Sequence, residues 1–383
     1  MSPNIPNWIQ CSPHISTLRT LASRERQRDG IRTVSRHRSH QLAAATSLQN
    51  TELLDHYSVT EGCKNQYGNR YMDIEPYDRT RVVVGVEEEQ RVTGASDAPN
   101  SQGRYLNASW VRELFGGKWW IATQAPLPTT AHTFLSILLQ PLTRPPQSLD
   151  PSTSTSPTCR IRTVVQLTQN VENGRQKAYA YFPYVDGQAW IVPSDPGSST
   201  PSIKVTLLET QRIPEIHGIQ SMVSIVPISS ADQEQAPITF RHILYTAWPD
   251  HGVPAQEDRA SLLALIRLID RINKDTSYQP HSNDLHPDPP IMVNCSAGIG
   301  RTGSFIGLAS LLRAYNLLVS GRALTMPSPV SPLPASPLGP LPDDIKDDLL
   351  ALEIDSLREQ RPGMVQRDEQ IMLMYEVLAA AFS

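Results

Sequence analysis

The chain has 383 residues and a formal net charge of −4, which is near neutral for this size. This charge argues against a protein that generally binds nucleic acid or adheres to membranes. The lack of a run of about 18 apolar residues argues against a membrane span. The four cysteines are few and irregularly spaced, which favours free thiols in a reducing compartment over a disulfide framework.

The N-terminal region has a composition of its own. Residues 1–50 are rich in Ser, Arg and His and poor in acidic residues. A mitochondrial presequence has a similar composition, but we favour a solvated tail that leads into an arginine-bearing helix. The sequence therefore predicts an N-terminal tail over residues 1–50, partly disordered or helical, and one folded region over residues 51–383.

Loop insertions are predicted near residues 142–158, 276–290 and 323–345. These stretches are polar and bear many prolines, so they cannot bury enough apolar surface to order themselves. The third contains seven prolines in the seventeen residues from Met326 to Pro342, which is typical of a disordered or polyproline II segment. Such a segment could bind an SH3-type or WW-type module, but we favour a tolerated surface insertion.

Ordinary secondary structure is predicted between these loops. Apolar or alternating runs predict strands at residues 119–123, 162–168, 203–207 and 240–245. Helical apolar spacing predicts helices at residues 257–272, 304–318, 349–360 and 370–381. Strands and helices mix without strict alternation. The predicted fold class is therefore α/β of a mixed α+β type, with a twisted mixed β-sheet flanked by helices on both faces.

The most informative stretch is IMVNCSAGIGRTG, from Ile291 to Gly303. Its apolar start predicts a buried strand that ends at Cys295, and the residues after Gly303 predict a helix. The turn between them contains glycines, so its backbone N–H groups can point inward and hold an anion at the helix N-terminus. The same positive field stabilises a thiolate, which makes Cys295 a candidate nucleophile.

Arg301 lies six residues after Cys295, where its planar guanidinium can bind two phosphate oxygens at once. A Cys and an Arg at this spacing also occur by chance, but the strand, the glycines and the helix together favour an anion site over a structural turn. A nucleotide-binding P-loop is excluded, because no Lys followed by Ser or Thr comes after the glycines. We therefore expect Cys295 to attack a phosphate.

Displacing an alcohol or phenol from phosphate requires an acid that protonates the leaving oxygen. The segment WPDHGVP offers the carboxyl group of Asp250, in a stretch that Gly252 allows to hinge and Trp248 can anchor in the core. Asp250 can afterwards accept a proton from water in a second step. By itself the segment is typical of a turn, but its place shortly before Cys295 favours the catalytic reading.

With these two motifs the chain resembles the classical protein tyrosine phosphatases of the non-receptor type, from about residue 65 to residue 378. Further strings carry the resemblance and occur in the family's order. They are NRYMDI at 69–74, YLNAS at 105–109, IATQAP at 121–126, VQLT at 165–168 followed by ENG at 172–174 and Lys177, and RPGMVQ at 361–366 followed by Gln370. The resemblance implies that residues 51–383 form the catalytic domain.

The resemblance also implies a role for each matched residue around the phosphate. Cys295 forms a cysteinyl-phosphate, and Thr302 hydrogen-bonds its sulfur. Arg301 holds the phosphate oxygens together with the backbone of the turn. The turn residues in this set are Ser296, Ala297, Gly298, Ile299 and Gly300.

Other matched residues act on the substrate or support the site. Tyr71 stacks on the substrate ring and sets the depth of the cleft, and Asp73 binds the peptide backbone. Gln366 orients the hydrolytic water with help from Gln370. Glu172 pairs with Arg301, with a surface carboxylate as the alternative reading, and Lys177 lies in the same loop as Glu172. No metal or cofactor is implied, because this chemistry stabilises charge with arginine and amides.

One departure from the family lies beside the nucleophile. Relatives carry His immediately before the cysteine, where this chain has Asn294. Asn can donate a hydrogen bond but cannot become cationic. We therefore expect an activity profile that is shifted toward higher pH.

The sequence thus predicts a protein-tyrosine-phosphatase that acts on phosphotyrosine-containing proteins in signal transduction, in the cytoplasm or alternatively in the nucleus. Two other functions remain open. A phosphotyrosine-binding pseudophosphatase is suggested only by Asn294, since Cys295 and Asp250 are both present. A phosphatase for phosphoserine, phosphothreonine or lipid phosphates is disfavoured by the motif around Tyr71.

Overall fold

A mixed β-sheet runs through the molecule. The computed structural model describes residues 5–10, 14–38, 48–85, 103–141, 143, 145–146, 148–149, 159–194, 200–228, 236–250, 252–279, 285–318, 327–330 and 335–382. In these residues nine strands form one sheet, in the order β1-β2-β3-β11-β4-β10-β9-β8-β7. Their bounds in that order are Arg81–Val84, Arg104–Arg112, Trp119–Gln124, Ile291–Cys295, Thr163–Gln166, Ile238–Tyr245, Gly218–Pro227, Ile203–Ile213 and Ala189–Val192.

The centre of the sheet is parallel and its two flanks are antiparallel. β3, β11, β4 and β10 run in the same direction, and the outer pairs alternate in direction. Every residue of β11 is buried, as expected for a strand that is covered on both faces. The carboxyl ends of these four strands therefore meet at one edge, which is where open α/β sheets place their ligand sites.

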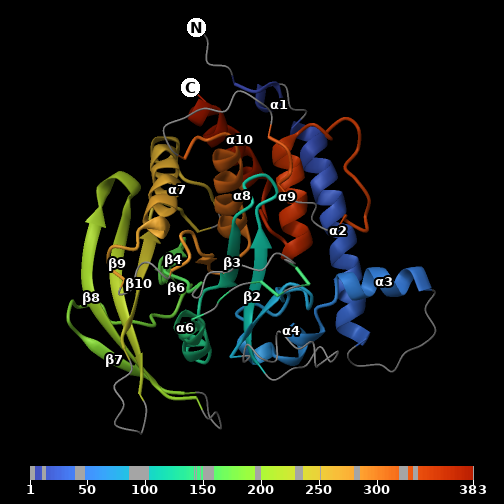
Figure 1. The fold of residues 1–383 in the computed structure, drawn as a ribbon. Helices are drawn as coiled ribbons and strands as arrows, with labels where there is room; N and C mark the ends of the chain where they lie inside the picture. Colours follow the sequence, from blue (N-terminus) through green and yellow to red (C-terminus); the bar gives the residue numbers. More distant parts are fainter. Residues whose placement is uncertain are drawn as a thin grey trace.

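Helices cover both faces of the sheet (Figure 1). One face packs against α7 (Arg259–Lys274), α8 (Gly300–Ala314), α9 (Leu349–Gln360) and α10 (Asp368–Phe382). The opposite face packs against α6 (Ala131–Leu139). The remaining helices are α1 (Asn7–Gln10), α2 (His14–Arg38), α3 (Leu48–His56) and α4 (Thr60–Lys64), with 3-10 turns at Gln66–Gly68, Pro214–Ile216 and Gln256–Asp258.

The predicted fold class is confirmed, and most predicted elements occur within a few residues of their expected bounds. The exceptions are β8, which continues to Ile213 and does not end near residue 207, and α8, which begins at Gly300 and not at residue 304. The amide of Gly303 donates to the carbonyl of Ile299 at 2.8 Å, so the glycine-containing turn is already the first turn of the helix. The helix also ends earlier than residue 318, because Asn316 adopts a left-handed conformation with φ 59°.

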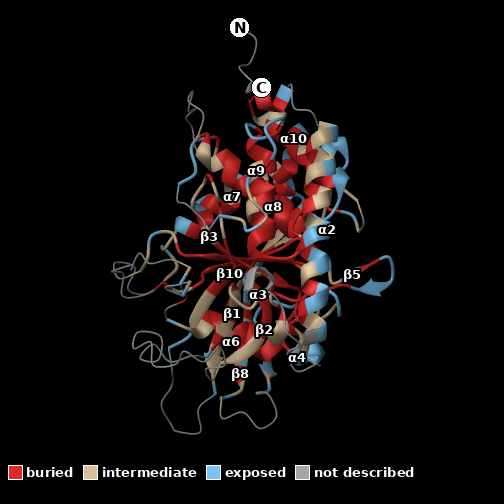
Figure 2. Ribbon diagram, turned by 90° about the vertical axis from the view of Figure 1, so that its right-hand side faces the viewer, coloured by how far each residue is buried: buried red, intermediate tan, exposed pale blue. Residues whose placement is uncertain are grey.

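The arginine-bearing helix expected in the N-terminal region corresponds to α2, which packs on α9. Leu21 and Arg28 of α2 are fully buried, and Arg24 and Arg28 form ion pairs with acids of α9 at 2.9 and 2.7 Å. Figure 2 shows α2 exposed on its outer side and buried toward the other helices. Apart from Leu21, the buried residues of this face are polar or charged, so hydrophobic periodicity could not reveal it.

The proline-rich insertion is described only in part. Arg24 donates hydrogen bonds to the carbonyls of Leu338, Gly339 and Pro340, so this part of the insertion packs against α2. These contacts favour the reading as a surface insertion over a free ligand segment. Residues 319–326 and 331–334, and most of the predicted insertion near 142–158, lie outside the described residues.

Candidate active site

Cys295 is the last residue of β11, and the chain turns sharply after it into α8. Gly298 has φ 72°, and a Cβ atom built there would lie 2.2 Å from the carbonyl oxygen of Thr123. Only glycine fits this position. The resulting turn brings the amide of Gly298 to 3.2 Å from the sulfur of Cys295, so a backbone donor stabilises negative charge on that atom.

Arg301 stands in the first turn of α8 with its guanidinium held from the neighbouring strand. Its Nη1 donates to the carbonyl of Leu167 at 3.0 Å and to Glu172 Oε1 at 2.7 Å. Its Nη2 donates to Glu172 Oε2 at 2.8 Å. Leu167 and Glu172 follow β4, which lies beside β11. The expected pairing of Glu172 with Arg301 is therefore present, and it is bidentate.

Glu172 and Arg301 both remain ionised although their side chains are buried. Burial opposes ionisation of Glu172, but hydrogen bonding to Arg301 and the charge of Arg301 outweigh it and lower the pKa of Glu172. Burial alone lowers the pKa of Arg301, while Glu172 and the charge on Cys295 raise it above its ordinary value. The site therefore keeps a fixed positive charge next to the sulfur.

Asp250 enters the site from the segment after β10. Its Oδ1 lies 3.4 Å from Arg301 Nη2, and its Oδ2 lies 2.7 Å from the ammonium group of Lys177. The indole of Trp248 is buried and donates to the carbonyl of Gly252 at 3.1 Å, so it anchors this segment as the sequence predicted. The acid follows β10, whereas the cysteine and the arginine follow β11, and the three residues meet at one sheet edge.

Tyr71 lies on the rim of the site. Its hydroxyl lies 2.8 Å from the hydroxyl of Ser296 in the turn after Cys295, and Ser296 also donates to the carbonyl of Lys177 at 3.1 Å. The segment before Tyr71 is fixed by Gln124, at the end of β3, which accepts from the amide of Arg70 at 2.8 Å. The side chain of Asp73 is exposed and has no contact with the turn among the described residues.

Gln366 and Gln370 lie near the N-terminal end of α8 on its other side. Gln370 is buried, and a Cβ atom built on Gly300 would lie 2.9 Å from Gln370 Nε2, so the two residues are in close contact. Gln366 is exposed and follows Val365, whose amide donates to the carbonyl of Ile299 at 3.2 Å. The turn after Cys295 therefore touches the segment that carries Gln366.

Arg361 supports the turn and was not among the predicted site residues. Its fully buried guanidinium donates to the carbonyls of Gly298 at 2.8 Å and Ala297 at 3.0 Å. It also donates to the side chains of Asn107 at 2.9 Å and Ser109 at 3.2 Å. Burial lowers its pKa to about 10, so it stays charged at neutral pH. Its place in the RPGMVQ string was the only available signal.

One predicted contact is not formed, and the side chain of Asn294 has no partner among the described residues. The hydroxyl of Thr302 is buried and has no hydrogen-bond partner in the part of the chain that the structure describes, so the expected bond to the sulfur is absent. Gly298 supplies a donor to the sulfur instead. Both amide atoms of Asn294 are likewise buried without a protein partner among the described residues. Asn294 therefore does not order the turn through its side chain.

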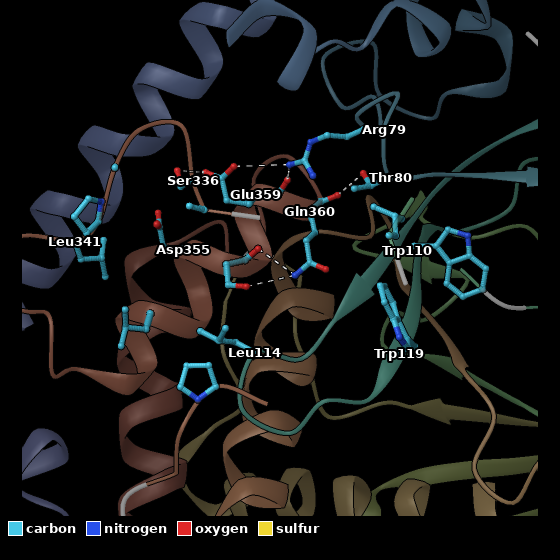
Figure 3. Close-up of a pocket in the computed structure, with 17 residues that line it drawn as sticks. Arg79, Thr80, Trp110, Leu114, Trp119, Ser336, Leu341, Asp355, Glu359 and Gln360 are labelled. Carbon is cyan, nitrogen blue, oxygen red and sulfur yellow. Dashed lines mark hydrogen bonds and ion pairs between the residues drawn. The ribbon is translucent and has the colours of Figure 1, made fainter. Parts of the chain in front are cut away.

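A separate cavity of about 440 Å³ lies away from this edge (Figure 3). It is lined by α9, the proline-rich insertion and the tryptophans Trp110 and Trp119, and by none of the predicted site residues. No group of three or more potential metal ligands occurs in the described ranges. Among those same residues, no helix combines the length and apolar character that crossing a bilayer requires.

The chain is similar to several tyrosine-protein phosphatases. Human tyrosine-protein phosphatase non-receptor type 13 is 26% identical over 334 residues, which cover 87% of this chain and 10% of that protein. Human receptor-type tyrosine-protein phosphatase H is 28% identical and is covered over 23% of its length. Protein-tyrosine-phosphatase PTP1 of Arabidopsis thaliana is 26% identical and is covered over 76%. The chain thus spans less than a quarter of the first two relatives.

A solved structure of PTPN18 in complex with HER2-pY1248 phosphopeptides has the same fold. It is 23% identical, with a TM-score of 0.55, and the match covers 88% of this chain and 96% of that chain. The family model described as protein-tyrosine phosphatase matches residues 65–143 and 158–321. This match includes Cys295, Arg301 and Asp250 and covers more than half of the chain, which therefore belongs to the protein-tyrosine phosphatase family.

Proposed function

We propose that this chain hydrolyses phosphotyrosine in proteins through a cysteinyl-phosphate intermediate. The observation that carries this proposal is the meeting of Cys295, Arg301 and Asp250 at one edge of the sheet. A nucleophile, a fixed cation and an acid are what the transfer of a phosphoryl group from a phenol requires.

In the first step the sulfur of Cys295 attacks phosphorus and the bond from phosphorus to the tyrosine oxygen breaks. Arg301 and the amides of the turn hold the three equatorial oxygens as charge redistributes. Asp250 donates its proton to the departing phenolate. Its position 3.4 Å from Arg301 Nη2 supports this role, because the carboxyl group lies beside the guanidinium that holds the phosphate.

In the second step water attacks the phosphorus of the cysteinyl-phosphate. Asp250, now a carboxylate, accepts a proton from that water, and the sulfur leaves as a thiolate. Gln366 orients the water, and Gln370 fixes the segment through its close contact with Gly300. Inorganic phosphate then leaves, and the starting protonation of Asp250 and Cys295 is restored.

The depth of the cleft selects phosphotyrosine over phosphoserine. The hydroxyl of Tyr71 contacts Ser296 at 2.8 Å, so the tyrosine side chain forms a wall between the rim of the site and the turn after Cys295. A phosphorylated phenol is long enough to reach Cys295 past this wall, while a phosphoserine side chain is too short. The substrates are therefore phosphotyrosine-containing proteins.

We further infer that the protein acts in the cytoplasm or the nucleus. The nucleophile must stay a reduced thiol, which these compartments favour. The three cysteines within the described ranges, Cys63, Cys159 and Cys295, are all free, in keeping with such a setting.

The test compares hydrolysis of a phosphotyrosine peptide and a phosphoserine peptide of the same sequence. The wild type is expected to release phosphate from the first peptide only, and Cys295→Ser from neither. Cys63→Ser is the matched control, because Cys63 lies outside the site. Equal activity of Cys295→Ser and wild type, or equal rates on both peptides, contradicts the proposal.

A further inference from the structure

Arg358 of α9 links its own helix to α2 and to the segment directly before Gln366. It lies in the last turn of α9, and its side chain is buried. Its guanidinium donates to the carbonyls of Met364 at 2.8 Å and Val365 at 2.7 Å. It also donates to the carbonyl of Leu21 in α2 at 2.8 Å. One buried cation thus holds both the N-terminal helix and the residues directly before Gln366.

The segment that Arg358 holds is strained. Val365 has φ 54°, a left-handed conformation that a β-branched residue rarely adopts and that persists only when its surroundings enforce it. On its other side the segment is pressed against α8, since a Cβ atom built on Gly303 would lie 2.5 Å from the amide nitrogen of Val365. Arg358 and the start of α8 together fix the turn from which Gln366 projects.

The helix that carries Arg358 is itself anchored at its C-terminal end. Figure 3 shows Arg79 and Thr80 beside the last residues of α9. Arg79 donates to the carbonyl of Glu359, and Thr80 Oγ1 donates to the carbonyl of Gln360 at 2.7 Å. The side chain of Gln360 bonds the backbone of Arg112 in β2. Arg358 therefore binds the strained turn from a helix whose C-terminal end is fixed by its neighbours.

Arginines of the N-terminal helix α2 form ion pairs with acids of α9 and hold the two helices together. Arg24 Nε lies 2.9 Å from Asp355 Oδ1, and Arg28 Nη2 lies 2.6 Å from Asp355 and 2.7 Å from Glu359. These contacts keep the carbonyl of Leu21 within reach of Arg358. The N-terminal helix is consequently part of the support of the Gln366 turn, although it does not reach the site itself.

We propose that Arg358, backed by α2, is a positioning residue for the second half-reaction, in which water attacks the cysteinyl-phosphate. The inference rests on the proposed function and assigns a new role within it. Arg358 contacts neither Cys295 nor Arg301 nor Asp250, so the first phosphoryl transfer does not depend on it. It controls Gln366, which is needed only when water attacks.

The test measures the two half-reactions separately in the full chain. The variants are Arg358→Met, which has no donors, and Arg358→Lys, which keeps the charge but can bind fewer carbonyls. Arg162→Met is the matched control, because Arg162 is also buried and donates to backbone carbonyls, those of Asn273 and Pro287, far from Gln366. Phosphoenzyme formed from a radiolabelled phosphotyrosine peptide is trapped by acid, and its decay is followed after dilution of the peptide.

For Arg358→Met we expect the phosphoenzyme to decay about tenfold or more slowly, because a small displacement of a positioned group reduces a rate by this order. kcat falls with the decay rate, and kcat/KM, which reports the first transfer, stays unchanged. The phosphoenzyme of Arg358→Lys decays at a rate between those of Arg358→Met and the wild type. Arg162→Met loses thermal stability without any change in the decay rate.

The inference is wrong if kcat and kcat/KM fall together in the Arg358 variants, or if the decay rate equals that of the wild type. If Arg358→Met does not fold, Arg358→Lys decides by the same comparison. The wild type separates this inference from the proposed function, because an inactive wild type that forms no phosphoenzyme refutes the function itself. A normal wild type with an unaltered Arg358 variant refutes only the positioning role.

Discussion

At the scale of single residues, the guanidinium of Arg301 has one tight and one loose acidic partner. Glu172 binds both of its terminal nitrogens at 2.7 and 2.8 Å, whereas Asp250 lies at 3.4 Å. The tight bidentate contact sets the orientation of the fork. The loose contact is the one that phosphate oxygens can replace when substrate binds. Two carboxylates near one arginine thus have different tasks.

Asn294 offers a test of how the turn after Cys295 is tuned. Its buried amide has no partner among the described protein groups, and it cannot carry a positive charge. We predict that Asn294→His shifts the acid limb of the kcat/KM profile toward lower pH, by up to about one pH unit. The measurement is a pH–rate profile with an aryl phosphate for both proteins.

The control for this profile is Asp250→Asn in the same two backgrounds. It removes the acid and lowers the rate, but it leaves the difference between Asn and His at position 294 in place. An acid limb that is identical for wild type and Asn294→His would show that residue 294 does not influence the nucleophile.

At the scale of elements, α9 contains a buried acid that makes stability depend on pH. Glu353 accepts from Ser310 at 2.6 Å and from the amide of Leu114 at 3.2 Å, yet burial dominates and raises its pKa to about 8 from 4.5. Between pH 4.5 and about pH 8, Glu353 is ionised in the unfolded chain but keeps its proton in the folded chain. The free energy of unfolding therefore falls as pH rises through this interval.

We predict that Glu353→Gln removes this dependence, because a neutral amide of the same shape cannot ionise. The contribution of Glu353 to the wild-type free energy of unfolding declines by at most about 1.4 kcal/mol per pH unit. Denaturant unfolding of both proteins from about pH 5 to about pH 8 checks this prediction. A difference between them that stays constant over the range contradicts it.

The sequence could predict those elements that bury an apolar face, and it could not predict those that bury charged side chains. α9 was predicted at its observed bounds and β8 by its alternation, because their apolar residues repeat with the period of the element. The docking of α2 could not be predicted, because Arg24 and Arg28 bury charge against acids more than 300 residues away in the chain. The contacts of Arg358 and Arg361 with backbone carbonyls could not be predicted from residue spacing, because a carbonyl acceptor leaves no pattern of residue types; only the RPGMVQ string pointed to Arg361.

At the scale of the whole molecule, the N-terminal helix α2 packs into the core that lies on one face of the sheet. Leu21 is fully buried in the same core as α8, α9 and α10. We predict that the most protected amides of α2 exchange with solvent deuterium as slowly as those of α9, and with the same free energy of opening. Native-state hydrogen exchange measures both.

A separately folding tail gives the opposite result, in which the amides of α2 exchange long before those of α9. The variant Arg28→Met sharpens the comparison, because Arg28 is fully buried and binds Asp355 and Glu359. Breaking such a buried pair costs about 3–5 kcal/mol. In one cooperative unit this loss lowers the protection of both helices equally.

The central claim is that the sulfur of Cys295 takes the phosphoryl group beneath Arg301. Rapid acid quenching of the wild type during turnover of a phosphotyrosine peptide, followed by peptide mapping with mass spectrometry, tests it most directly. We predict one phosphoryl group on the peptide that contains Cys295, and none in Cys295→Ser. Steady turnover with no phosphoryl group on Cys295, or with the group on another residue, contradicts the account.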